Sequence, residues 1–121
     1  MPARRVTRVL LADVAGTSRR ALAGLLSGLD GVTLVGEASD RSELAGALRR
    51  TTADVLVIDD RLLSRDSHVL AGVGPHHAGL RVIVLGIDDD PAFSARALRL
   101  GAERWIVKDR AGEELPALLA T

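Results

Sequence analysis

Three polar side chains that could do chemistry together each follow a short apolar run. They are Asp13, Asp59 and Lys108, and Lys108 is the single lysine in a chain that otherwise uses arginine. Two carboxylates offer the oxygen ligands that a divalent cation prefers, and a lysine ammonium can pair with the oxygens of a phosphoryl group. If the fold brings them together, these residues predict a site for a divalent cation and a phosphoryl group.

The elements that must position these residues alternate along the chain. Apolar runs without polar alternation are typical of strands covered on both faces, and they occur at 9–12, 32–35, 55–58, 82–85 and 105–107. Between them lie segments with helical spacing, such as the apolar residues at 21, 22, 25, 26 and 29. This order predicts an α/β fold: a five-stranded parallel sheet flanked by helices on both faces, with its site beyond the carboxyl ends of the strands.

Helix ends carry their own signals. Asp40 followed by Glu43 predicts a capping box, and Asp90 with Pro91 predicts an N-cap before a helix that Gly101 closes. Glycine and proline interrupt segment 64–79, where we expect a short or distorted helix. A helix is expected to begin at 16–18, but the sequence there has neither a Walker lysine nor a G-x-G-x-x-G pattern. We therefore expect no nucleotide-binding site at this helix.

Composition limits the possible functions. The chain has 121 residues, 47% of them hydrophobic, with 16 basic and 16 acidic side chains and no cysteine. The length and the absence of cysteine predict one domain without disulfides. The net charge of zero does not favour nucleic-acid binding by the chain itself. DNA contact is expected only through a domain outside this chain. No signal peptide or membrane span is apparent, which favours a cytoplasmic location.

The five segments that contain these signals resemble one family when taken in order. The chain is similar to the receiver domains of bacterial two-component response regulators, in particular those of the LuxR-type DNA-binding regulators. The matching segments are RVLLAD at 8–13, VTLVGEASD at 32–40, ADVLVIDDR at 53–61, RVIVLG at 81–86 and ALRLGAERWIVKD at 97–109. The resemblance implies a flavodoxin-like receiver fold over residues 1–121.

The resemblance also implies roles for individual residues. Asp59 stands where the family has the aspartate that accepts a phosphoryl group from a histidine kinase, and Lys108 where a lysine pairs with the phosphoryl oxygens. Asp13, Asp59 and the backbone carbonyl of Arg61 stand at the Mg²⁺ ligand positions. Trp105 stands where an aromatic residue rotates inward on activation, although it could equally be a packing residue.

Two positions depart from the family pattern. Val14 replaces the second of two adjacent acids that hold Mg²⁺, and Gly86 replaces a threonine or serine whose hydroxyl bonds the phosphoryl group. Valine supplies no oxygen ligand, so we expect Mg²⁺ binding to be weak or absent. With its acidic neighbour missing, Asp13 is either a remaining ligand or a hydrogen-bond partner of Lys108.

The resulting interpretation is an atypical receiver domain, not an enzyme, of a dimeric transcriptional regulator with Asp59 as candidate phosphoacceptor. One alternative is a phosphorylation-independent module of the same fold, controlled by a ligand, a partner or dimerisation. A less favoured alternative is a small α/β enzyme that uses Asp13, Asp59 and Lys108. The short closing segment, 112–121, leads us to expect a domain excised from a longer regulator with a C-terminal DNA-binding domain.

Overall fold

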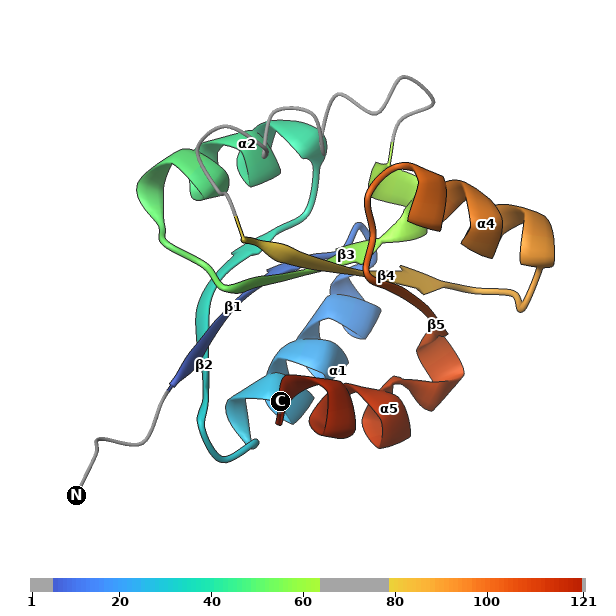
Figure 1. Ribbon diagram of the computed structural model, residues 1–121. Coiled ribbons are helices and arrows are strands. Elements are labelled where there is room, and N and C mark those ends of the chain that lie inside the picture. The colour runs from blue at the N-terminus through green and yellow to red at the C-terminus, as the bar shows by residue number, and fades with distance from the viewer. Residues whose placement is uncertain (1–5, 64–78, 121) are drawn as a thin grey trace.

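The sheet carries the fold and has five parallel strands in the order β2-β1-β3-β4-β5. The computed structural model describes residues 6–63 and 79–120. Its strands are β1 (Thr7–Ala12), β2 (Val32–Ala38), β3 (Val55–Asp59), β4 (Arg81–Gly86) and β5 (Arg104–Val107). Each coincides with one of the predicted apolar runs, so the predicted α/β architecture is confirmed (Figure 1).

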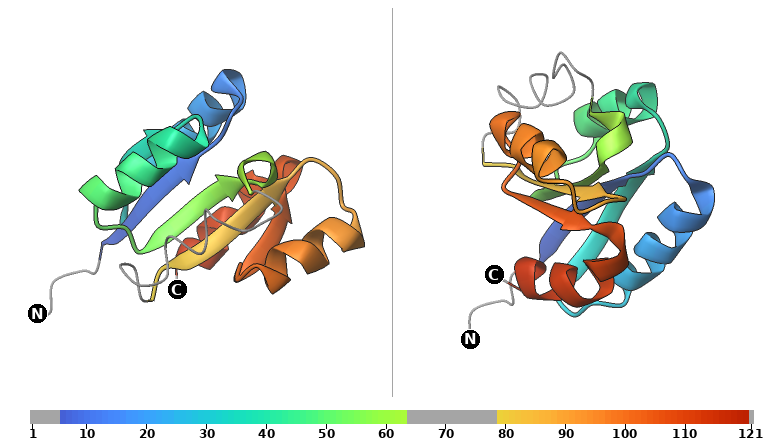
Figure 2. Two further views of the ribbon diagram at one scale, coloured as in Figure 1. Left: turned by 90° about the horizontal axis from the view of Figure 1, so that it is seen from above. Right: turned by 90° about the vertical axis from the view of Figure 1, so that its right-hand side faces the viewer.

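Helices cover both faces of this sheet, as Figures 1 and 2 show. One face carries α1 (Gly16–Ser27) and α5 (Ala111–Leu119), and the other carries α2 (Arg41–Arg50) and α4 (Pro91–Arg99). Two single turns of 3₁₀ helix, η1 (Asp60–Leu62) and η2 (Lys108–Arg110), directly follow β3 and β5. The carboxyl ends of the strands therefore lead straight into the short turns that carry the candidate residues.

The core is divided by the sheet into two layers. Leu10, Leu56 and Val84 point toward α2 and α4, whereas Leu11, Val57 and Leu85 point toward α1 and α5, because successive side chains of a strand face opposite sides.

Burial differs between the strands. Strand β3 is buried along its whole length, but the edge strand β2 is only partly covered. The prediction of strands covered on both faces therefore holds for the centre of the sheet and not for this edge.

The helix ends match the predicted signals with one change. The Asp40 carboxylate accepts a hydrogen bond from the Glu43 backbone N–H at 2.8 Å, but the Glu43 carboxylate accepts from the backbone N–H of Ser39 at 2.7 Å instead of from Asp40. This bond closes the capping box one residue earlier than predicted. Asp90 caps α4, and Gly101 follows it with a φ of 108°, a conformation that side-chain-bearing residues rarely adopt.

Two further predictions concern segment 64–79 and the absence of a membrane span. The distorted helix predicted for 64–79 lies outside the described residues, except for Gly79 itself. Among the described helices, none combines the length and apolar character that a membrane crossing requires.

Candidate functional site

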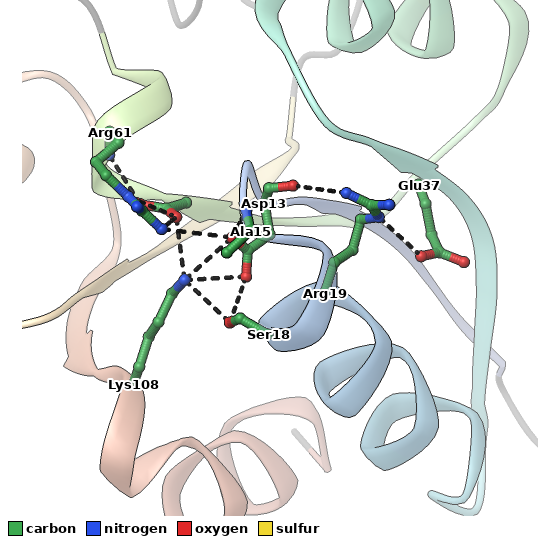
Figure 3. Close-up of polar contacts among 8 residues, drawn as sticks. Asp13, Ala15, Ser18, Arg19, Glu37, Arg61 and Lys108 are labelled. Carbon is green, nitrogen blue, oxygen red and sulfur yellow. Dashed lines mark hydrogen bonds and ion pairs between the residues drawn. The ribbon is translucent and has the colours of Figure 1, made fainter.

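The three residues predicted to meet do meet, at the carboxyl edge of the sheet. The Lys108 Nζ atom donates to both carboxylate oxygens of Asp13, at 3.1 and 3.0 Å, and to Oδ2 of Asp59 at 3.0 Å. Figure 3 shows Lys108 extending from η2 toward Asp13 and Ser18. The predicted proximity is therefore confirmed, while the roles in phosphoryl transfer remain predictions.

The fold explains why these side chains converge. Asp13 follows β1, and its backbone N–H donates to the Ala38 carbonyl at 2.9 Å, which ties the end of β1 to β2. Asp59 ends β3 and caps η1, while Lys108 opens η2 directly after β5. Because parallel strands share one carboxyl edge, three segments far apart in the sequence deliver their polar side chains to the same place.

Asp13 is only 1% exposed and has many hydrogen-bond partners. Its Oδ1 accepts from the backbone N–H of Ala15 at 3.0 Å, and its Oδ2 accepts from the Ser18 hydroxyl at 2.6 Å. The same hydroxyl accepts from Lys108 Nζ at 3.0 Å. Asp13 is thus a hydrogen-bond partner of Lys108, and its role as a metal ligand stays a prediction.

The carboxylate of Asp59, 2% exposed, is held by Arg61 as well as by Lys108. The Arg61 backbone N–H donates to Oδ1 at 2.9 Å, and the guanidinium Nη2 donates to Oδ2 at 2.7 Å. Burial alone would raise the pKa of Asp59, but the hydrogen bonds from Arg61 and Lys108 outweigh it and lower the pKa to about 2. Asp59 is therefore a carboxylate at any physiological pH.

Together the contacting side chains form a neutral group: two carboxylates, the Lys108 ammonium and the Arg61 guanidinium. The guanidinium Nη2 that contacts Asp59 also lies 3.8 Å from Oδ1 of Asp13. The two cations compensate the two carboxylates, which is the condition for keeping Asp13 and Asp59 buried. We call Asp13, Asp59, Arg61 and Lys108 the four-charge cluster.

The four-charge cluster does not fit a divalent cation as it stands. Val14, 37% exposed, brings no oxygen to the site, and the oxygens of Asp13 and Asp59 already accept hydrogen bonds from nitrogen. Among the described residues, no three His, Cys, Asp or Glu side chains are grouped as a metal site requires. The role of the Arg61 backbone carbonyl as a metal ligand stays a prediction. The Arg61 side chain, however, donates hydrogen bonds to the Asp59 oxygens that a metal ion would need.

Trp105 lies across the end of β4 at the position of the missing hydroxyl. A Cβ atom built on Gly86 would lie 2.0 Å from indole atoms Cζ2 and Cη2, so the indole fills the space that a side chain would take. The ring also stacks on Phe93, with centroids 6.5 Å apart and an interplanar angle of 26°. Trp105 is thus a packing residue in this structure, and its role as a switch stays a prediction.

Three contributions to the site were not predicted from the sequence. The Ser18 hydroxyl bridges Asp13 and Lys108, and the guanidinium of Arg61 covers Asp59, whereas the sequence assigned only a backbone carbonyl to Arg61. Arg19 adds a third, since its guanidinium donates to the Asp13 carbonyl at 3.2 Å and pairs with Glu37 (Figure 3). The spacing of Asp59 and Arg61, two residues apart across a strand end, is the signal that could have indicated this contact.

The sequence and the fold were compared with those of known proteins. No family model matches the chain. The protein named "Probable transcriptional regulatory protein NarL" of Mycobacterium tuberculosis is 29% identical over 109 residues, which are 89% of this chain and 50% of that protein. The chain therefore spans half the length of this curated relative.

Solved structures agree with this relative. The signal receiver domain of NarL from Mycobacterium tuberculosis matches with a TM-score of 0.83 and 26% identity, over 96% of this chain and 94% of that one. The isolated receiver domain of RcsB from Salmonella enterica serovar Typhimurium matches with a TM-score of 0.82 and 26% identity, over 96% of this chain and 87% of that one. In sequence, fold and strand order, the chain is thus similar to the receiver domains of response regulators of the NarL and RcsB type.

Proposed function

We propose that this chain is the signal-receiving module of a transcriptional regulator, with Asp59 as a phosphoacceptor that reacts slowly. One observation carries the proposal: the acceptor carboxylate is already bound by Arg61 and Lys108, in a site where Val14 brings no second acid. One relative is named a probable transcriptional regulatory protein and another is a receiver domain, which supports a signalling role over the enzyme alternative.

The chemistry explains why the reaction is slow. An Asp59 oxygen must attack phosphorus while the bond from phosphorus to the donor breaks, a P–N bond in a phosphohistidine or a P–O bond in acetyl phosphate, and the electron pair of that bond departs with the leaving group. Both reactants are anionic, so cations must offset their repulsion. Lys108 and Arg61 supply positive charge, but they also hold the attacking oxygens in hydrogen bonds, and one of these must open first. The added opening step raises the barrier.

The end of β4 limits the response of the domain to phosphoryl transfer. Gly86 has no hydroxyl to donate to a phosphoryl group on Asp59, and the space above it holds the indole of Trp105. A hydrogen bond to a charged group is worth roughly 1.5 to 3 kcal/mol, comparable with the free energy that separates two states of a switch. Phosphorylation of Asp59 is therefore a weak signal to this end of the sheet.

Partners follow from the same proposal. We propose a histidine kinase as phosphoryl donor, a homodimer as the active assembly, DNA contact through a domain outside this chain, and a cytoplasmic location. Structures of RcsB include two dimers bound to two parallel DNAs. A dimer suits paired DNA half-sites, because its two-fold symmetry matches theirs.

The test measures phosphorylation of Asp59 directly. We would incubate the domain with acetyl phosphate and Mg²⁺ and follow the phosphorylated fraction by intact mass. Val14→Asp supplies the missing acid, and Val6→Asp is the matched control because Val6 is also exposed but precedes β1 at the opposite end of the strand.

We expect at least a tenfold faster gain of mass for Val14→Asp than for the parent, no change for Val6→Asp, and no gain when Asp59→Asn is added. A parent that is phosphorylated as fast as Val14→Asp contradicts the proposal.

A second candidate is the phosphorylation-independent module, and the position of Trp105 favours it. The indole already packs over Gly86 and against Phe93, so Trp105 joins α4 to β5 without any modification of Asp59. If neither the parent nor Val14→Asp gains the phosphoryl mass while both remain folded, this second function replaces the first.

A further inference from the structure

We infer that the guanidinium of Arg61 takes the place of a divalent cation in this receiver site, so that the domain holds its two buried carboxylates together without metal. The inference concerns the resting state of the proposed acceptor site, and it stands whether or not Asp59 ever receives a phosphoryl group.

The contacts of Arg61 are those of a bridging cation. Nη2 lies 2.7 Å from Oδ2 of Asp59 and 3.8 Å from Oδ1 of Asp13, and Nε lies 3.3 and 3.2 Å from the two oxygens of Asp59. The guanidinium therefore spans the edge of one carboxylate and reaches toward the other. A metal ion that joins two carboxylates occupies the same kind of position.

The charges of the site lead to the same conclusion. Asp13 and Asp59 are neutralised by Lys108 and Arg61, so the four-charge cluster has no net charge left for a divalent ion to compensate. An incoming ion would have to displace Arg61 from Asp59 before it could bind a carboxylate oxygen there. Without Arg61, two carboxylates would face one ammonium, which leaves one uncompensated negative charge and free oxygens.

The position of Arg61 in the chain explains why its guanidinium binds Asp59 in preference to a metal ion. Arg61 is two residues from Asp59, and its own backbone N–H already donates to Oδ1 of Asp59 at 2.9 Å. The guanidinium is thus tethered at the site, so its contact with Asp59 is intramolecular, whereas a metal ion must be captured from solution. Its side chain is 47% exposed, so water and ions can reach the place it occupies.

The inference predicts a metal site where Arg61 is removed. The remaining ligands would be the carboxylates of Asp13 and Asp59, completed by water, which suits a hard divalent cation with oxygen ligands. It also predicts that the parent domain gains little stability from such an ion, because a ligand stabilises a fold little unless its concentration exceeds its dissociation constant for the folded state.

The experiment compares Mn²⁺ binding, by electron paramagnetic resonance of the free ion, in the parent, Arg61→Ala and Arg110→Ala. Arg110 is the matched control. Its side chain is 57% exposed and lies 3.8 Å from the exposed carboxylate of Asp89. Arg110→Ala therefore removes one positive charge, as Arg61→Ala does, but outside the four-charge cluster. We expect Arg61→Ala to bind Mn²⁺ at least tenfold more tightly than the parent, Arg110→Ala to match the parent, and Asp59→Asn added to Arg61→Ala to abolish the gain.

A second measurement covers a variant that folds poorly. Arg61→Met keeps most of the aliphatic stem, and circular dichroism of both Arg61 variants is followed with and without Mn²⁺ or Mg²⁺. Recovery of the folded signal on adding the ion supports the inference. Equal Mn²⁺ affinity in parent and variants, or variants that the ion neither binds nor refolds, overturns it. No phosphoryl donor is present, so this outcome is independent of the phosphorylation test.

Discussion

The close approach of Trp105 to Gly86 makes Gly86→Ala the most informative single change. An added Cβ would lie 2.0 Å from Cζ2 and Cη2 and 2.9 Å from Cε2 of the indole, far inside ordinary contact distance. Strand β4 is paired on both sides, with Leu85 opposite Asp59 and Gly86 opposite Val107, so its backbone has little freedom to withdraw. The indole must move instead.

The expected cost depends on where the indole can go. If it stays in place, the strain is that of an overpacked core, about 1 to 3 kcal/mol. If it swings away, it loses its packing on the core and its stacking on Phe93, and an aromatic pair is worth about 0.5 to 1.5 kcal/mol beyond the buried area. Either route lowers the free energy of unfolding by about 1 to 3 kcal/mol.

The assay is urea unfolding followed by circular dichroism, together with the emission spectrum of the single tryptophan. We expect Gly86→Ala to lower the unfolding free energy and, if the indole leaves, to shift its emission to longer wavelength. In a Trp105→Ala background, the same glycine change should cost less than about 0.5 kcal/mol, because nothing then opposes the new Cβ. An equal cost in both backgrounds, or no cost in either, would refute the reasoning.

Two further predictions concern the four-charge cluster. The pKa of Asp59, about 2 in the folded protein against an ordinary value of 3.8, means that its ionised form contributes about 2 kcal/mol of stability above pH 4, which is lost as the pH falls toward 2. Urea unfolding at a series of acidic pH values should show this loss, and Asp59→Asn should flatten the profile over the same range. Lys108→Met should lower the unfolding free energy by about 3 to 5 kcal/mol at neutral pH, since it leaves buried Asp13 and Asp59 without their shared cation. That loss should shrink as the pH falls and Asp59 becomes protonated, and a loss independent of pH would show that Lys108 acts through packing alone.

The Gly86 geometry also affects any attempt to restore the ordinary family site. Gly86→Thr would return the missing hydroxyl, but its Cβ meets the indole just as that of alanine does. A productive restoration therefore needs a smaller residue at position 105 or a displaced indole, in addition to Val14→Asp. The two departures from the family pattern are thus unequal: Val14 is partly exposed and open to replacement, and Gly86 is not.

The sequence by itself determined the architecture and the meeting of the three polar residues. Apolar runs without alternation need cover on both faces, and the alternation of such runs with helical segments leads to a parallel sheet between helices. Because the carboxyl ends of parallel strands share one edge, Asp13, Asp59 and Lys108 could be placed at the same edge once the strands were known. The caps at Asp40 and Asp90 were predictable for a similar reason, since a side chain near a helix start contacts backbone only a few residues away.

The tertiary structure alone decided what surrounds those three residues. The guanidinium of Arg61 lies at the end of a long flexible side chain. Where that side chain points depends on the charges of Asp59 and Asp13, and Asp13 comes from a different strand. The place of Trp105 depends likewise on the absence of a side chain at Gly86 on the neighbouring strand. Both arrangements join atoms from different elements, and their geometry is set by side-chain torsions and packing that no spacing along a single segment encodes.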